Sequence, residues 1–232
     1  MDKVKLMDRI ETKFVLSAKQ LPDILERIKN DYRIASIAGN TNPEYKTVYF
    51  DTDHYFFYHE HHRKRKDRFK VRFRNYVDSN LTFLEVKHKK NGRIDKQRIK
   101  VENEQFSIDS ESESFLKESD IDKTDLKIKL TNSYHRITLV ANQSVERVTF
   151  DMDIKFKYKD TESEMDNLVI VEIKQPFLSR TTPVYKALRE SQIKPYNISK
   201  YCIGLISTHN EEKIKYNNFK KKLIKINKIN LQ

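Results

Sequence analysis

Alternating cations mark one segment of the sequence as able to hold a polyanion. Residues 68–74 read Arg-Phe-Lys-Val-Arg-Phe-Arg. In a β-strand this order puts the four cations on one face and Phe69, Val71 and Phe73 on the other. Four like charges on one face repel each other unless something anionic lies between them. Because phosphoryl transfer depends on positioning and charge neutralisation, the pattern favours chemistry on a phosphate chain.

Other strand-like segments repeat this ionic face and add carboxylates to it. On one face each they carry Arg9, Glu11 and Lys13; Glu85, Lys87 and Lys89; Tyr134, Arg136 and Thr138; Arg147, Thr149, Asp151 and Asp153; and Glu172 and Lys174. Two interpretations stay open: a one-layer sheet with a solvated face, or a closed barrel with charge inside and apolar residues outside. The barrel is favoured because the polar face is almost purely ionic.

Three carboxylates on the cationic face, Glu11, Glu85 and Glu172, are candidates for holding a divalent metal. Mg²⁺ and Mn²⁺ take hard oxygen ligands, commonly one or two carboxylates together with substrate phosphates. The alternative for each carboxylate is a role as a salt-bridge partner only. The sequence therefore predicts Mn²⁺ or Mg²⁺ as the cofactor and leaves the number of protein ligands open.

Composition excludes several other classes of protein. The chain has 232 residues, a net charge of +12 and a single cysteine, Cys202, so an internal disulfide and a Cys-rich zinc site are excluded. Its three glycines are isolated, which excludes a glycine-rich phosphate loop. No apolar run reaches the ~18–20 residues of a membrane span, and the N-terminus has no signal-peptide core. We therefore expect a cytoplasmic protein.

Histidines gather next to the basic run 63–66, at His54, His59, His61 and His62. Their spacing does not match a zinc site, because no third or fourth ligand is evident. The interpretation is a structural or solvated role, with phosphate contact as the alternative.

Periodicity predicts an α+β protein of antiparallel strands. Strands are expected over 9–16, 46–51, 68–77, 81–90, 94–102, 133–140, 146–157 and 167–174, and helices over 18–31, 182–193 and 197–208. The acidic stretch 110–130 predicts one or two surface helices, and the histidine-rich segment is expected to be a loop. Turns between the strands are mostly short, as at Asn91-Gly92, and this favours antiparallel pairing.

The C-terminal segment is the most basic part of the chain. Its last 20 residues contain seven lysines and no acid. We expect a main domain over 1–208 and a basic tail or helix over 209–232. The segment predicts a solvated amphipathic helix with Ile214, Phe219, Leu223 and Ile226 on one side, and contact with a membrane or a polyanion is the alternative.

Nine segments together resemble the VTC domain, the polyphosphate polymerase module of the CYTH-like triphosphate tunnel metalloenzyme superfamily. They are Arg9–Phe14, Val48–Thr52, Arg68–Arg74, Phe83–Lys87, Gly92–Arg98, Tyr134–Arg136, Arg147–Asp151, Val171–Lys174 and Ser199–Tyr201. Each is weak alone, but they follow the family's order across roughly residues 9–205.

The resemblance implies an eight-stranded antiparallel β-barrel, or triphosphate tunnel, with helices packed outside and a C-terminal helix at the tunnel mouth. It implies phosphate contacts from Lys13, Arg72, Arg74, Lys87, Lys96, Arg98, Arg136, Arg147 and Lys200, with Lys96 and Arg98 as alternatives for one position. Among these, Arg72, Arg74, Lys87 and Lys200 are the expected catalytic residues. Glu172 is the implied metal ligand.

The implied activity is metal-dependent transfer of the γ-phosphate of ATP to a growing polyphosphate chain. The alternatives are hydrolysis of tripolyphosphate or nucleoside triphosphates, and polyphosphate binding without catalysis. Arg9 stands where the tunnel hydrolases have the first Glu of a Glu-x-Glu-x-Lys signature, which favours the polymerase branch. We expect neither the regulatory domain nor the membrane helices of fungal VTC proteins in this chain. A separately encoded membrane protein is therefore a candidate partner that would place the enzyme at a membrane, and no specific nucleic acid is expected.

Overall fold

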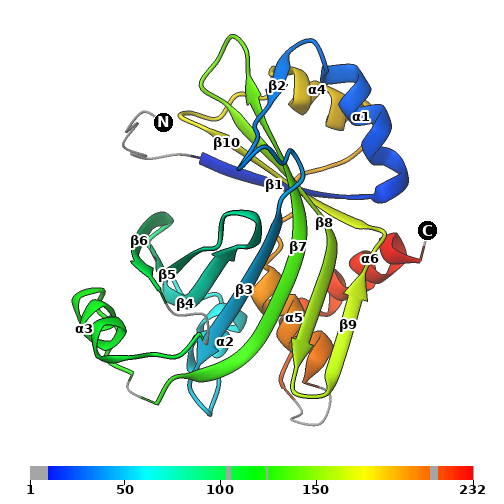
Figure 1. The fold of residues 1–232 in the computed structure, drawn as a ribbon. Helices are drawn as coiled ribbons and strands as arrows, with labels where there is room; N and C mark the ends of the chain where they lie inside the picture. The colour runs from blue at the N-terminus through cyan, green and yellow to red at the C-terminus, as the bar shows by residue number, and fades with distance from the viewer. Residues whose placement is uncertain (1–9, 103–105, 124, 210–213, 232) are drawn as a thin grey trace.

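An antiparallel sheet of eight strands, in the order β1-β10-β8-β7-β3-β4-β5-β6, forms the frame of the protein (Figure 1). The computed structural model describes residues 10–102, 106–123, 125–209 and 214–231, so the predicted role of Arg9 lies outside the described residues. The eight strands are β1 (Ile10–Ser17), β3 (Glu44–Asp51), β4 (Asp67–Tyr76), β5 (Leu81–Lys90), β6 (Arg93–Val101), β7 (Lys127–Ala141), β8 (Arg147–Tyr158) and β10 (Leu168–Gln175). Two short strands extend the sheet, β2 (Tyr32–Ile34) beside β7 and β9 (Thr161–Met165) beside β8.

The sheet curls until its two ends face each other. β1 and β5 lie near opposite ends of the strand order, yet Lys87 Nζ of β5 is 3.5 Å from Glu11 Oε2 of β1. Among the described residues β1 pairs only with β10 and β6 only with β5, so no backbone hydrogen bonds join the two edges. The predicted α+β fold of eight antiparallel strands is confirmed, with the barrel open as a half-barrel along one side.

Helices cover the outer face of the half-barrel, as predicted. α1 (Leu21–Ile28) and α4 (Pro183–Glu190) pack on β1, β10, β8 and β7, where Ile24 and Leu188 are fully buried. α2 (Phe56–His62) and α3 (Ser110–Glu118) pack on β3, β4 and β5, where Val71, Phe73 and Leu84 are fully buried. The apolar side of each alternating strand therefore forms the wall that the helices seal.

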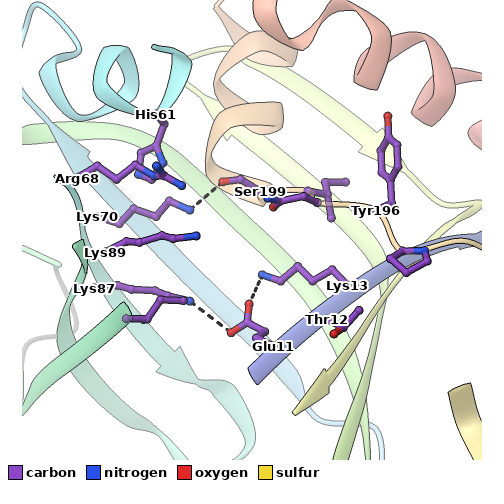
Figure 2. Close-up of a pocket in the computed structure, with 14 residues that line it drawn as sticks. Glu11, Thr12, Lys13, His61, Arg68, Lys70, Lys87, Lys89, Tyr196 and Ser199 are labelled. Atoms are coloured by element: carbon purple, nitrogen blue, oxygen red, sulfur yellow. Dashed lines mark hydrogen bonds and ion pairs between the residues drawn. The ribbon is translucent and has the colours of Figure 1, made fainter. Parts of the chain in front are cut away.

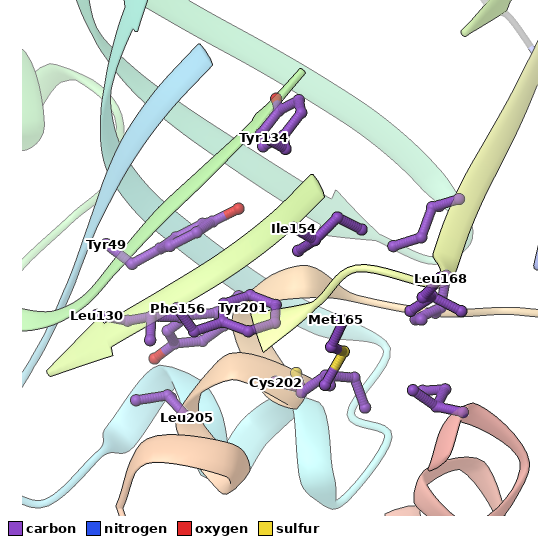
Figure 3. Close-up of a cluster of buried hydrophobic side chains, with 14 of the residues drawn as sticks. Tyr49, Leu130, Tyr134, Ile154, Phe156, Met165, Leu168, Tyr201, Cys202 and Leu205 are labelled. Carbon is purple, nitrogen blue, oxygen red and sulfur yellow. The ribbon is translucent and has the colours of Figure 1, made fainter. Parts of the chain in front are cut away.

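The inner face is divided between an apolar half and an ionic half. α5 (Lys200–Thr208) lies inside the half-barrel, where its Tyr201 and Leu205 pack on Tyr49, Leu130 and Phe156 (Figure 3). Along several strands the inward-facing residues change from ionic to apolar at the level where this helix begins. β1 runs from Glu11 and Lys13 to buried Val15, and β10 runs back from Lys174 and Glu172 to buried Ile170. The helix therefore plugs one end of the lumen, and the charges line the other end.

A β-bulge corrects the predicted face of Asp153. The register between β7 and β8 shifts between Ser133 and His135, and Asp153 has a positive φ of 52°. Its carboxylate points away from the lumen and pairs with His135 Nδ1 at 3.2 Å, with about half of its side chain exposed. Beyond the bulge the alternation is reversed, so Ile154 faces the inside and packs in the same cluster as α5.

One buried carboxylate explains why residues 56–62 form a helix and not the predicted loop. Asp51 Oδ1 accepts from the backbone N–H of Phe57 and its Oδ2 from that of Tyr58, each at 2.9 Å. These bonds satisfy donors of the first turn that no helical carbonyl can reach. The hydroxyl of Tyr201 also donates to Asp51, which ties α5 to the same point. Helical periodicity gives no sign of the first contact, which comes from a strand residue six positions before Phe57, and the contact with Tyr201 is long-range.

Other predicted elements differ mainly in extent. The first helix begins only at Leu21, after a 3-10 turn over Ala18–Gln20 that Ser17 and Gln20 cap, and it ends at Ile28. The acidic stretch contains α3 alone, because β7 begins at Lys127 and is 15 residues long. The strands predicted over 46–51 and 94–102 and the Thr182-Pro183 helix start lie close to expectation, whereas β2 and β9 were not predicted.

The basic C-terminal segment folds back onto the core. A 3-10 turn over Asn217–Phe219 leads into α6 (Lys220–Asn230), and Ile226 is fully buried against the α5 cluster. Asn167, at the β9–β10 turn, donates through its backbone N–H and its side chain to Asn230 at 3.1 and 3.0 Å. The predicted apolar side is confirmed, and it packs against the core. The described helices include none that is both long enough and apolar enough to span a bilayer.

Gly204 sets how closely α5 can approach the sheet. A Cβ at this position would lie 2.4 Å from Phe156 Cδ1 and 2.6 Å from Leu130 Cδ2. We expect Gly204→Ala to lower the free energy of unfolding by about 1–3 kcal/mol through overpacking, as measured by urea denaturation. Helix propensity alone would change stability in the opposite direction by ~1 kcal/mol. A more stable variant would therefore show that this close approach is not required.

Candidate functional site

Three clusters of ion pairs fill the ionic half of the inner face. The first joins β1, β10 and β5. Lys13 Nζ lies 2.6 Å from Glu11 and 3.1 Å from Glu172, while Lys174 Nζ is 2.6 Å from Glu172 and Lys87 Nζ reaches Glu11. Lys13 and Glu172 are directly paired in register, which places both on the same face. The result is two carboxylates shared by three lysines.

The second cluster surrounds a fully buried carboxylate, Glu85 of β5. Arg72 donates to one oxygen of Glu85 through Nε at 2.9 Å and Nη2 at 2.7 Å, and Arg74 Nε is 4.0 Å away. Lys96 of β6 pairs with the other oxygen. The second Arg72 amino group lies 3.3 Å from the Tyr49 hydroxyl. Three cations therefore share one carboxylate, whose side chain has 0 % exposure.

The third cluster lies where the ionic half meets α5. Arg136 of β7 donates from Nη2 to Asp151 of β8 at 2.8 Å, and Lys200 at the first position of α5 pairs with the same carboxylate. Lys200 Nζ also lies 3.9 Å from the centre of the Tyr134 ring, a cation–π contact. Lys200 is thus held at the inner end of the ionic half, as expected for a residue closing the lumen.

Two predicted phosphate contacts lie on the same face but outside the clusters. Arg98 is paired in register with Glu85, and its guanidinium stacks 4.5 Å over the Phe83 ring. Of the two alternatives, Lys96 therefore joins the Glu85 cluster and Arg98 does not. Arg147 is paired in register with Lys174 at the exposed start of β8. The structure thus brings together seven of the predicted cations, and these two flank them.

Cations outnumber carboxylates in all three clusters, and the burial of these groups shifts their pKa values. Burial raises the pKa of Glu85, but Arg72, Arg74 and Lys96 outweigh it and keep the pKa well below its usual range. Asp151 behaves likewise, with a pKa of about 2. Desolvation lowers the pKa of Lys87, Lys96 and Lys200 to about 8 in spite of their carboxylate partners. A bound anion would relieve this excess of buried positive charge.

A cavity of about 400 Å³ opens from the first cluster along the gap between the sheet edges (Figure 2). Sequence reasoning placed Arg68, Lys70 and Lys89 on the ionic face but did not assign them to the site, and it left His61 undecided. All four line this cavity together with Ser199. Lys70 Nζ donates to Ser199 Oγ at 2.9 Å, and burial lowers the lysine pKa to about 8. The signal was present in the Arg68–Arg74 alternation, whose four cations all point inward.

The carboxylates differ in how well they suit a divalent metal. Glu11 and Glu172 both contact Lys13 Nζ, so these two oxygen donors already converge on one cation. Glu85 already has Arg72, Arg74 and Lys96 as cationic partners. Within the described part of the chain no three His, Cys, Asp or Glu side chains are grouped as a metal site. A site of two carboxylates suits a metal that also binds substrate phosphates.

Comparison with known proteins agrees with this architecture. The family model for the VTC domain matches residues 8–209. A solved structure from Bacillus halodurans, provisionally named an adenylate cyclase, has a TM-score of 0.56 and 14% sequence identity and covers 83% of this chain and 96% of its own. A Hippeastrum protein, provisionally named an adenylyl cyclase and described as having a dominant triphosphatase activity, has a TM-score of 0.57 and 13% identity and covers 90% and 100%. The chain has no significant match among curated proteins.

Glu85 should act as the internal counterion of the Arg72 cluster. Without it, two largely buried arginines and Lys96 lose their partner, so we expect Glu85→Gln to lower the free energy of unfolding by about 3 kcal/mol or more in urea denaturation. Tripolyphosphate should recover more stability in this variant than in the wild type, because the anion replaces the lost charge.

Glu164→Gln is the matched control, since Glu164 pairs with Lys155 on the surface with 47 % of its side chain exposed. We expect this change to cost less than about 1 kcal/mol. Equal losses in the two variants would show that Glu85 has no special role.

Proposed function

The chain belongs to the VTC domain family, and on that premise we propose that it is a polyphosphate polymerase acting on ATP. Membership of the family and the tunnel fold together support an enzyme that acts on triphosphates. The observation that carries the proposal is the surplus of cations on the inner face, with Arg72, Arg74 and Lys96 around a single fully buried carboxylate. No covalent nucleophile is required, because phosphoryl transfer needs positioning and charge neutralisation above all.

In the proposed reaction the triphosphate of ATP enters the lumen and replaces the carboxylates as partner of the cations. Arg72, Arg74 and Lys87 neutralise the oxygens of the γ-phosphate, and Lys200 holds the chain at the inner end. A terminal oxygen of the polyphosphate attacks the γ-phosphorus in line. The bond from the γ-phosphorus to the β–γ bridging oxygen breaks, and ADP leaves with that oxygen. The chain becomes one phosphate longer, and Lys13, Lys96, Arg98, Arg136 and Arg147 provide further phosphate contacts.

Glu172, with Glu11 beside it, is the proposed holder of Mn²⁺ or Mg²⁺. When bound, such an ion would supply positive charge that neutralises phosphate oxygens. Lys13, which lies between the two carboxylates, would then be released to contact phosphate. Glu85 is not included among the proposed ligands, because three cations already occupy it.

Hydrolysis is the second candidate activity, with water in place of the polyphosphate end. The observation that favours it is the similar fold of the Hippeastrum protein, which is described as having a dominant triphosphatase activity. A polymerase and a hydrolase would use the same cations, so the products distinguish them.

The test of the proposed function is product analysis after incubation of the full chain with ATP and Mn²⁺. We expect long-chain polyphosphate and ADP in matching amounts, and orthophosphate with ADP would instead establish the hydrolase. Arg72→Ala should lower turnover ~10²–10³-fold, since it removes a charged contact to the transferred group. Arg93→Ala, at the exposed β5–β6 turn, is the matched control and should keep full activity. An active Arg72 variant would contradict the assigned site.

The metal assignment has its own test. Glu172→Gln keeps the shape of the side chain but removes its charge, so a metal titration of turnover should shift to concentrations at least about tenfold higher. Glu162→Gln, which affects an exposed partner of Lys157, serves as the control. An unchanged titration for Glu172→Gln would rule out its role as a ligand.

A further inference from the structure

A second cavity, of about 140 Å³, opens beside the first one and carries only positive charge. Its charged lining residues are Lys64 from the turn after α2, Arg68 from β4 and Lys222 from α6, and none of its described lining residues is acidic. Sequence segments more than 150 residues apart are therefore brought together here. Asn218 holds them in place, because its side chain donates to the His62 carbonyl at 3.0 Å.

The two cavities are adjacent. Both are lined by His61, Arg68, Asn197, Ile198 and Ser199, so they share one wall. Figure 2 shows Arg68, His61 and Ser199 together at the end of the first cavity that is remote from Glu11. A ligand that extends past this end of the first cavity would therefore meet the residues that also line the second.

Cations continue along the same wall beyond the shared residues. Lys222 Nζ donates to the carbonyl of Asn197, and Lys225 Nζ lies 4.3 Å over the ring of Tyr196, which lines the first cavity. The buried Nε of Arg68 has no hydrogen-bond partner within the described part of the chain. A donor without a partner beside a group of cations suits an anion with several oxygens.

We propose that Lys64, Lys222 and Lys225 form an outer track that binds the part of a polyphosphate chain lying outside the lumen. This inference rests on the proposed function, and it gives the basic C-terminal helix a role in binding long chains. A polyphosphate chain is thin and charged along its whole length, so it can follow a narrow path along two adjacent cavities. A flat bilayer surface cannot enter them, which favours the free chain over anionic lipid.

The test is binding of two probes, tripolyphosphate and long-chain polyphosphate, to the full chain. The triple variant Lys64→Gln, Lys222→Gln and Lys225→Gln should bind the long chain about tenfold or more weakly at low salt. The slope of log affinity against log salt should fall by about one per lysine. Affinity for tripolyphosphate should not change, because that probe fits within the lumen. The control triple variant, Lys117→Gln, Lys155→Gln and Lys186→Gln, removes equal charge elsewhere and should behave as the wild type.

Several results would overturn the outer track. They are an unchanged affinity for the long chain, an equal loss in the control variant, or an equal loss for tripolyphosphate. Loss of binding to anionic phospholipid vesicles with intact binding of polyphosphate would identify a membrane surface instead. Because Lys222 also donates to the 195–199 segment, Lys64→Gln alone provides a second test and should weaken only the long probe. Length-dependent binding without polymer synthesis would contradict the proposed polymerase activity but would still support the outer track.

Discussion

Burial of many like charges on one face of a sheet is stable only where opposite charge balances them. In this protein Glu85, Asp151 and the pair of Glu11 and Glu172 provide that balance, and every one of these centres carries more cations than carboxylates. Breaking a buried ion pair costs more than an exposed pair contributes. Among these carboxylates, Glu11 joins the two ends of the curled sheet through Lys87. The remaining positive charge is what a phosphate chain would neutralise. The requirements of folding and of binding are therefore met by the same residues.

The position of α5 depends on these buried carboxylates, and its first residue joins one of the ion-pair clusters. Its first residue, Lys200, shares Asp151 with Arg136, while Tyr201 donates to the Asp51 carboxylate that caps α2. Gly204 lets the helix lie directly on Phe156 and Leu130. One helix thus seals the apolar half of the lumen and sets the inner limit of the ionic half. α6 and the turn before it then fix the wall on which the two cavities meet.

Much of this fold can be predicted from alternation. From Arg68 to Arg74 ionic and apolar residues take turns, so that every ionic residue lies on one face of the strand and every apolar residue on the other. Alternation fails where the backbone leaves regular geometry, as at the bulge that turns Asp153 outward. It also cannot show that Glu11 and Glu172 share Lys13, since β1 and β10 are distant in sequence. The helix at 56–62 depends on Asp51, and the contribution of α6 to the core depends on packing, so neither follows from local pattern.

The most direct measurement of the central claim is a crystal structure of the full chain with tripolyphosphate and Mn²⁺. The predicted result is a phosphate chain on the inner face, with oxygens bound by Arg72, Arg74 and Lys87 and with the metal held by Glu172. Lys13 should then contact phosphate, and it should no longer bridge Glu11 and Glu172. A tripolyphosphate bound only at α6 or elsewhere on the surface, with the three ion-pair clusters unchanged, would contradict the claim that the buried cations are the phosphate site.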